Sequence, residues 1–319
     1  MIVTPALAAA NNGNWHTARR WAGMLSAAYR VRLATGWAQG DEALMIALHA
    51  RRSADAVARW RAARPAAPLV LVLTGTDLYR DIAVDASAQA SLQAADRLVV
   101  LNELGAAALP AALRSKACVV LQSCASRRPA EKTSRHLRAL MVGHLRAEKS
   151  PQTVFEAARR LGARRDILID HVGAALDPAL GALADATMRQ CPGYRWLGAL
   201  PHAAARRRIQ SAHVLVHPSR IEGGAHVVIE AVRSGTPVLA SRIDGNIGLL
   251  GEGYDGYFPP GDAARLAILL ERLRDAPAML THLQAQCRVR EPLFDPAREA
   301  ASLHEMLAGL LSRPTDPPH

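Results

Sequence analysis

The sequence predicts an α/β protein with two domains, each built on a doubly wound parallel sheet. Three observations lead to this prediction. The 319 residues suit two domains of ordinary size. Hydrophobic residues make up 50% of the chain, which is enough for two buried cores. Short runs rich in β-branched residues and leucine alternate with helical patterns, and that alternation is typical of parallel sheets covered by helices.

The first domain is expected over residues 1–125. Its predicted strands lie at 2–5, 31–35, 44–49, 69–73, 98–101 and 119–122. Its predicted helices lie at 15–25, 53–64, 86–95 and 103–113. Residues 123–136 are polar and without periodicity, which predicts a linker.

The second domain is expected over residues 135–290. Its predicted strands lie at 140–142, 167–172, 194–198, 213–217 and 237–241. Helices are expected at 265–273 and 279–289, and a last one at 296–311 within a separate segment, 291–319, that ends in a short tail.

The stretch from 214 to 241 organises this second region as strand, glycine loop, helix and strand. Gly223 and Gly224 allow a tight turn before a helix, and backbone N–H groups at a helix start suit a phosphate. Glu222 in the loop and Glu230 on the helix could accept hydrogen bonds from sugar hydroxyls. The alternative is an ordinary connection with solvated glutamates, because short motifs match by chance.

Polar residues follow several other predicted strands. In doubly wound sheets, ligands bind outside the carboxyl ends of the strands, so these residues are candidates for a binding site. They are Gly13 and Asn14 of the Asn11–Asn14 turn, His49, Arg51, Arg52, Thr74, Gly75, Thr76, Asp77, Arg80, and the segment 143–149. Each one alone would suit an ordinary loop.

Composition narrows the possible partners. The net charge is +11 and the isoelectric point is about 10.3, which suits nucleic acid, a membrane surface or a small polyanion. The excess is scattered arginine without lysine runs or interleaved aromatics, so nucleic acid is disfavoured. No apolar run is long enough for a membrane span, and no signal peptide is evident. We therefore expect a cytoplasmic protein with no membrane partner and four reduced cysteines.

The motifs together resemble the family-4 glycosyltransferases, which have the GT-B fold. Gly143 to Lys149 resembles that family's Gly-Arg-Leu-x-x-x-Lys segment, with His144 in place of arginine and Arg146 as an extra cation. Glu222 and Glu230 match the family's two glutamates. The resemblance implies two Rossmann-like domains facing an interdomain cleft, and a C-terminal helix in 291–319 that crosses back to the first domain.

The resemblance also implies roles for individual residues. A UDP-hexose donor, UDP-GlcNAc or UDP-glucose, would bind on the second domain. Its binding residues would be Gly143, His144, Arg146, Lys149, Glu222, Gly223, Gly224 and Glu230. Residues with catalytic roles would be Glu222, Lys149, Arg146 and Thr74. No cofactor and no metal are expected, since the chain has no Asp-x-Asp motif and its histidines show no ligand spacing.

Four segments, Asn14 to Trp21, Leu48 to Ser53, Leu73 to Asp81 and Arg220 to Gly224, together resemble one branch of the family, the selenosugar synthases of selenoneine biosynthesis. Thr74 stands where the family usually has histidine. The acceptor implied by the branch is selenophosphate, with functional links to a selenophosphate synthetase and to a downstream enzyme that forms C–Se bonds. Its binding residues would be Gly13, Asn14, Arg19, His49, Arg51, Arg52, Gly75, Thr76, Asp77, Arg80 and Arg220.

Three other hypotheses stay open. An ordinary family-4 enzyme would glycosylate a hydroxyl of a saccharide or lipid, and would want an apolar acceptor groove. A basic, non-catalytic nucleic-acid-binding protein would show a steep salt dependence of affinity and no need for Glu222. A nucleotide-sugar epimerase or a phosphorylase could share the two-domain cleft.

Overall fold

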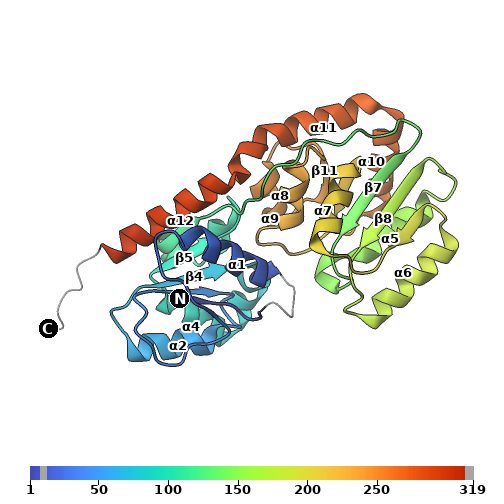
Figure 1. Ribbon diagram of the computed structural model, residues 1–319. Helices are drawn as coiled ribbons and strands as arrows, with labels where there is room; N and C mark the ends of the chain where they lie inside the picture. Colours follow the sequence, from blue (N-terminus) through green and yellow to red (C-terminus); the bar gives the residue numbers. More distant parts are fainter. Residues whose placement is uncertain (8–12, 313–319) are drawn as a thin grey trace. The chain divides into compact units, whose positions relative to one another are not determined.

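The computed structural model describes residues 1–7 and 13–312, and the chain divides into two compact units (Figure 1). Unit 1 comprises Met1–Ser123, Glu222–Gly224 and the chain from Pro296 onwards. Unit 2 comprises Cys124–Ile221 and Ala225–Asp295. Asn11 and Asn12 of the expected first turn lie outside the described residues.

Unit 1 contains a parallel sheet whose described strands run in the order β2-β1-β3-β4-β5-β6. The strands are β1 (Ile2–Val3), β2 (Leu33–Ala34), β3 (Met45–Leu48), β4 (Leu69–Leu73), β5 (Arg97–Val100) and β6 (Ala117–Val119). Side chains alternate along β4, so Leu71 packs in one buried cluster and Val72 in another. Both faces of the sheet are therefore apolar and need a cover.

Helices cover both faces of this sheet (Figure 1). They are α1 (Gly13–Leu25), α2 (Ala54–Ala63), α3 (Ile82–Val84), α4 (Ala86–Ala94) and α12 (Pro296–Leu311). Trp60 of α2 and Leu92 of α4 pack in the cluster that holds Leu71. Trp21 of α1 and Leu303 of α12 pack in the cluster that holds Val72.

A buried carboxylate fastens α12 to unit 1. Glu299 accepts hydrogen bonds from Trp21 Nε1 at 2.6 Å, from Arg20 Nε at 2.9 Å and from the backbone N–H of Ser123 at 2.8 Å. Its side chain is fully buried, and the guanidinium of Arg20 balances its charge. The last described helix therefore belongs to the core of unit 1.

Unit 2 contains a second parallel sheet, whose described strands run in the order β12-β11-β10-β7-β8-β9. The strands are β7 (Leu137–Val142), β8 (Ile167–Val172), β9 (Tyr194–Trp196), β10 (Val214–His217), β11 (Val238–Ser241) and β12 (Tyr257–Phe258). The helices are α5 (Pro151–Arg160), α6 (Pro178–Gln190), α7 (His202–Ser211), α8 (His226–Val232), α9 (Asp244–Leu250), α10 (Ala263–Asp275) and α11 (Pro277–Arg290).

Each sheet has a point where its strand order reverses. In unit 2 the chain runs from β7 outward through β8 and β9, and then returns to β10 on the other side of β7. In unit 1 the corresponding neighbours are β1 and β3. Ligands of doubly wound sheets bind at such switch points, at the carboxyl ends of the strands. The loops after β7 and β10, and those after β1 and β3, are therefore the places to examine.

The structure corrects the sequence analysis in a few places. The expected helix over 103–113 is instead two 3₁₀ turns, Gly105–Ala108 and Ala111–Lys116. Pro110 separates them, because a proline disfavours helical conformation in the residue before it. The strand expected at 119–122 lies at Ala117–Val119. Helices α5, α6, α7 and α9 were not anticipated. Within the described residues, no helix combines the length and the apolar character needed to cross a membrane.

Candidate active site

The loop after β7 carries the expected cations. Gly143 follows the strand, a 3₁₀ turn spans Ala147–Lys149, and α5 begins at Pro151. A Cβ at Gly143 would lie 3.6 Å from the Lys149 side chain, so the aliphatic stem of this lysine runs along the glycine backbone. Arg146 is exposed at the same loop. Two positive side chains thus extend from the carboxyl end of the strand at the switch point.

His144 is not a third cation. Its Nδ1 atom accepts a hydrogen bond from the backbone N–H of Ala174 at 3.1 Å. Burial, together with the positive charges of Arg146 and Lys149, lowers the pKa of His144 below its usual value. The imidazole is therefore neutral at pH 7, and it ties the loop after β7 to the loop after β8.

The loop after β8 supports the loop after β7. Gly173 has a φ of +158°, and a Cβ there would lie 1.9 Å from the carbonyl oxygen of Gly143, so no other residue fits without moving the loop. His171 is buried with Nε2 3.2 Å from that same carbonyl oxygen, and its Nδ1 lies 2.9 Å from the hydroxyl of Tyr194. Burial lowers the pKa of His171 to about 4. The neutral ring can donate to Gly143 while it accepts from Tyr194.

The loop after β10 lies beside the loop after β7. The backbone N–H of Arg220 donates to the carbonyl of Glu148 at 2.8 Å, and the side chain of Arg220 is exposed. The next three residues, Glu222–Gly224, group with unit 1. Glu222 there is buried, with 9% of its surface exposed.

The two glycines of this loop serve close packing. Within unit 1, Asn102 Nδ2 donates to the carbonyl of Gly223 at 2.7 Å. A Cβ on Gly223 would lie 2.5 Å from the carbonyl oxygen of Thr74, and one on Gly224 would lie 2.7 Å from Leu101. The helix expected behind these glycines is α8, which starts at His226 and has seven residues. At both positions a side chain would collide with neighbouring atoms, so the glycines allow close packing there.

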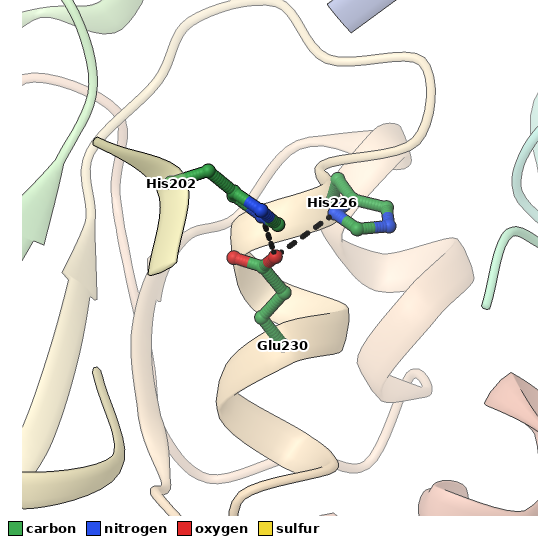
Figure 2. Close-up of side chains that lie close together, drawn as sticks. All are labelled: His202, His226 and Glu230. Carbon is green, nitrogen blue, oxygen red and sulfur yellow. Dashed lines mark hydrogen bonds and ion pairs between the residues drawn. The ribbon is translucent and has the colours of Figure 1, made fainter. Parts of the chain in front are cut away.

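Glu230 lies on α8 and is surrounded by nitrogen atoms (Figure 2). Its Oε1 atom is 2.6 Å from His202 Nε2, 3.4 Å from His226 Nδ1 and 3.6 Å from Arg206 Nε. Burial alone would raise the pKa of Glu230, but the hydrogen bonds from His202 and His226 outweigh burial and lower the pKa to about 2. This carboxylate is therefore ionised, buried and oriented before any ligand binds.

In unit 1, Asp77 holds the loops after β3 and β4 together. Its Oδ1 accepts from the backbone N–H groups of Thr74 and Gly75, each at 2.9 Å, and its Oδ2 accepts from that of Ala50 at 2.9 Å. The residue is fully buried. Asp77 therefore shapes the site that the sequence analysis assigned to it, and its carboxylate oxygens face the protein backbone.

His49 is held beside Asp77 in an unusual backbone conformation. It has a φ of +74°, which is uncommon for a residue other than glycine. Its Nε2 atom lies 3.2 Å from the hydroxyl of Thr76, and 3.9 Å from a carboxylate oxygen of Asp81. Burial lowers the pKa of His49, although the charges of Asp77 and Asp81 act in the opposite direction.

Two of the predicted acceptor arginines converge on one carboxylate. Arg51 Nε is 2.9 Å from Asp81 Oδ2, and Arg80 Nε is 3.0 Å from Asp81 Oδ1. Burial would raise the pKa of Asp81, but the hydrogen bonds from Arg80 and Arg51 lower it. Arg51 and Arg80 are both exposed, as is Arg52. The loops after β3 and β4 therefore present guanidinium groups at a common edge. Asp81 holds two of them, those of Arg51 and Arg80, in ion pairs.

The remaining predicted acceptor residues lie on α1. Gly13 and Asn14 form the start of this helix, and Arg19 follows on an exposed position. The helix follows β1, which pairs with β3 in the sheet. These residues thus share the carboxyl edge of the sheet with the loop that carries His49.

Sequence reasoning missed three residues at these edges, His171, His202 and Arg206, and it gave no role to Asp81, which follows the strand at 69–73. One signal was available, because His226 and Glu230 are four residues apart on a helix and must share a face. The partners from other elements had no such signal. A shallow hollow near Leu161, Ile167 and Gly193 lies at the amino end of β8, away from all of these loops.

Comparison with known families decides the identity of the fold. A family model described as "Glycosyl transferases group 1" matches residues 122–288, which is just over half of the 319 residues. The chain belongs to the group 1 glycosyltransferases. The match falls almost wholly within unit 2 of this group 1 chain, the unit that carries the loops after β7 and β10.

Two curated relatives match parts of this group 1 chain. The D-inositol 3-phosphate glycosyltransferase of Arthrobacter sp. (strain FB24) is 35% identical over 147 residues, which is 44% of this chain and 34% of the relative. The D-inositol 3-phosphate glycosyltransferase 1 of Catenulispora acidiphila is 37% identical over 86 residues, 27% of this chain and 21% of the relative. The aligned part thus spans about a third or less of each relative.

Solved structures are similar over most of the chain. Sucrose-phosphate synthase from Thermosynechococcus elongatus superposes with a TM-score of 0.70 at 18% identity, covering 85% of this chain and 74% of that one. HepE from Anabaena, solved with UDP, gives 0.68 at 15% identity, covering 83% and 78%. TarM from S. aureus gives 0.67 at 12% identity, covering 85% and 55%. These identities establish the fold alone: two Rossmann-like units of the GT-B class.

Proposed function

We propose that the protein transfers a hexose from a UDP-hexose donor, UDP-glucose or UDP-GlcNAc, to selenophosphate. The observation that carries the donor part is the switch point of the second sheet. There, the cations Arg146 and Lys149 follow β7, and the oriented carboxylate Glu230 follows β10. Membership of the group 1 glycosyltransferases supports a glycosyl-transfer reaction. The structure of HepE with UDP-glucose supports the choice of nucleotide.

Each donor residue has a chemical task in this proposal. Lys149 and Arg146 balance the diphosphate charge, which grows as the bond to the sugar breaks. Glu230 accepts hydrogen bonds from the ribose hydroxyls, replacing those from His202. Glu222 orients a hydroxyl of the hexose. Gly143, Gly223 and Gly224 complete the proposed donor-binding set. The reaction is expected to proceed without a metal, since side-chain cations balance the leaving group.

The acceptor part rests on the arginines of unit 1. Arg51, Arg52 and Arg80 present guanidinium groups at the edge formed by the loops after β3 and β4. Thr74 and Thr76 carry hydroxyl groups there, and Arg19 is a further exposed cation of unit 1. Arg220 of unit 2 is exposed as well. Guanidinium groups bind phosphate oxygens through paired hydrogen bonds. A small, doubly charged acceptor suits such a surface better than an apolar alcohol.

The chemical step forms one bond and breaks another. An electron pair on selenium forms the C–Se bond at the anomeric carbon, and the bond from that carbon to the UDP oxygen breaks, so UDP leaves with the electron pair. The selenium is already anionic, so no general base is needed. Water then cleaves the Se–P bond, releasing phosphate and the 1-selenosugar. Positioning and charge stabilisation are thus the main demands on the protein.

A second candidate is transfer to a hydroxyl of a phosphate-bearing polyol. It is favoured by the names of the two curated relatives, which act on D-inositol 3-phosphate. The same arginines could hold a phosphate on such an acceptor. Membership of a glycosyltransferase family favours either enzyme over a non-catalytic nucleic-acid-binding protein. Cytoplasmic location and links to selenium metabolism stay predictions.

The test is a product analysis with both acceptors. The protein is incubated with UDP-glucose or UDP-GlcNAc and either selenophosphate or D-inositol 3-phosphate, with and without EDTA. We expect UDP release and a selenium-bearing sugar by mass spectrometry with selenophosphate, unaffected by EDTA. UDP release with the inositol phosphate alone would overturn the acceptor and keep the donor. Release with neither acceptor would overturn both.

A further inference from the structure

Three metal-ligand atoms lie together on two helices of unit 2 (Figure 2). His226 and Glu230 stand one turn apart on the same face of α8, and His202 is the first residue of α7. One nitrogen from each imidazole and one oxygen from the carboxylate all lie within 4.8 Å of one another. Figure 2 shows both rings directed at Glu230.

The donor set selects a class of metal. Two imidazole nitrogens with one carboxylate oxygen suit zinc and its neighbours in the first transition row, and such sites leave one position open. Magnesium and calcium prefer sets made entirely of oxygen. Ligand atoms on a tetrahedral zinc are about 3.4 Å apart when its bonds are about 2.1 Å long. The separation of His226 Nδ1 from Glu230 Oε1 is 3.4 Å.

One ligand must move for a metal to enter. His202 Nε2 lies 2.6 Å from Glu230 Oε1, a hydrogen-bond distance that is too short for two ligands of one ion. The side chain of His202 is 54% exposed, so its ring can rotate outward by less than an ångström at little cost. Glu230 and His226, more buried and on one helix, would stay in place.

The positive charge of Arg206 lowers the affinity that these three residues can have for a metal ion. Its Nε atom lies 3.6 Å from Glu230 Oε1 and competes with any cation for that oxygen. Its Nη2 atom, however, donates to the carbonyl of Ala125 at 2.9 Å, which keeps part of the guanidinium directed elsewhere. The site is therefore able to take a dication, with an affinity reduced by one nearby positive charge.

We propose that His202, His226 and Glu230 form a binding site for zinc or a similar divalent transition metal, and that a bound metal blocks the nucleotide. The blocking follows because the metal would occupy the carboxylate that is assigned to the ribose. That second part rests on the proposed function, whereas the metal site itself does not. The metal would be an inhibitor, so the expectation of metal-independent catalysis is unchanged.

The first experiment measures metal binding to the full chain without nucleotide. The protein is stripped with chelator and titrated with Zn²⁺ by calorimetry, and with Co²⁺ by visible absorption. We expect a tight site that His202→Ala and His226→Gln each weaken by more than about tenfold, since even the partners of metal ligands contribute 10–100-fold. Arg206→Gln should strengthen binding, because it removes the competing charge.

His282→Ala is the matched control. His282 Nε2 lies 2.7 Å from Asp255 in an exposed histidine–carboxylate pair on another helix, α11. Its removal should leave the tight site unchanged. Absence of the site in the wild type, or equal zinc binding by the wild type and the His202→Ala variant, would overturn the proposal. Circular dichroism checks that each variant folds, and His202 is exposed enough for that to be expected.

The second experiment tests the blocking. Zinc is titrated in the presence of saturating UDP, and UDP is titrated in the presence of saturating zinc. We expect each to weaken the other by the same factor, as linkage requires. Zinc binding that UDP does not affect would overturn the blocking and keep the site. Failure of UDP to bind the zinc-free protein would instead count against the proposed donor.

Discussion

Asp77 and Glu230 are two buried carboxylates, one near the carboxyl edge of each sheet, and they are held in opposite ways. Asp77 accepts three hydrogen bonds from backbone N–H groups of Ala50, Thr74 and Gly75. Glu230 is met by side chains, chiefly those of His202 and His226. Backbone donors cannot leave without unfolding the loops, whereas a side chain can rotate away.

This difference separates a carboxylate that shapes the loops around it from one that can exchange partners. Asp77 fixes the position of Thr74 and Gly75, and through them the edge of unit 1. Glu230 keeps its charge and its orientation while His202, which is half exposed, gives up its contact. A ligand hydroxyl or a metal ion can therefore replace the histidine at Glu230. Nothing comparable is available at Asp77.

The largest expected effect comes from removing the carboxylate of unit 1. Asp77→Ala should lower the free energy of unfolding by about 3–5 kcal/mol, because it leaves three N–H groups without their acceptor and opens a gap in a buried loop. Urea denaturation measures the loss. Asp77→Asn keeps one acceptor oxygen and should lose less. If Glu230→Gln cost as much stability as Asp77→Ala, the contrast between the two carboxylates would be wrong.

The two edges also differ in their buried histidines. His171 lies under the loop after β7, and burial lowers its pKa from 6.5 to about 4. Burial lowers the pKa of His49 as well, but the negative charges of Asp77 and Asp81 partly oppose that effect. Between about pH 6.5 and pH 4 the unfolded chain binds a proton at His171 that the folded chain does not. Stability therefore falls as the pH falls through this window, by up to about 3 kcal/mol.

The measurement is the unfolding free energy from pH 7.5 to pH 4 for the wild type, His171→Gln and His49→Gln. Replacing His171 should flatten the pH dependence more than replacing His49, because two carboxylates, Asp77 and Asp81, lie within about 4 Å of His49 and oppose the effect of burial there. Equal slopes for wild type and His171→Gln would show that His171 is not responsible. If His49→Gln flattened the pH dependence of the unfolding free energy more than His171→Gln, the prediction would be wrong.

Unit 2 could be predicted well from the sequence because its signals are local. The strand at 167–172 has the predicted bounds. Gly143, Lys149, Glu222 and Glu230 form spaced motifs that can be read along the chain. What could not be read was the environment of Glu230, because His202 approaches from a different helix, and the packing of Gly223 against Thr74.

Unit 1 was predicted in outline and less well in its site. The strand at 69–73 and the helix at 296–311 have the predicted bounds, since long apolar runs give strong periodic signals. Asp77 was predicted to face the acceptor, but three backbone N–H groups surround it. Asp81 was given no role, although it forms ion pairs with Arg51 and Arg80. Such roles depend on contacts between loops of separate strands, which spacing along the chain does not encode.

A smaller effect is expected on ligand binding at Glu230. Glu230→Gln should weaken UDP binding by about 1–3 kcal/mol, because the amide keeps one acceptor oxygen and loses the charge that strengthens hydrogen bonds from the ribose hydroxyls. Calorimetry with UDP on the zinc-free protein measures it. Glu252→Gln is the matched control, since Glu252 is an exposed glutamate paired with Arg242. Unchanged UDP affinity in Glu230→Gln would contradict the proposed contact between Glu230 and the ribose.

The smallest effect on stability is expected at the arginines of unit 1, which are exposed, in contrast to the buried carboxylates. Arg51→Ala and Arg80→Ala should each change the free energy of unfolding by less than about 1 kcal/mol, because each is an exposed partner in an ion pair. Either variant leaves the buried carboxylate of Asp81 with one arginine. The double variant leaves it with none, so its loss should exceed the sum of the single losses.

Acceptor binding should respond differently. If both arginines hold the acceptor's phosphate, each single variant already raises the KM for selenophosphate and so lowers kcat/KM, while kcat changes less. A double-mutant cycle measured by urea denaturation and by initial rates separates the two. Additive stability losses would mean that Asp81 does not depend on this pair, and an unchanged KM in both single variants would move the acceptor away from this edge.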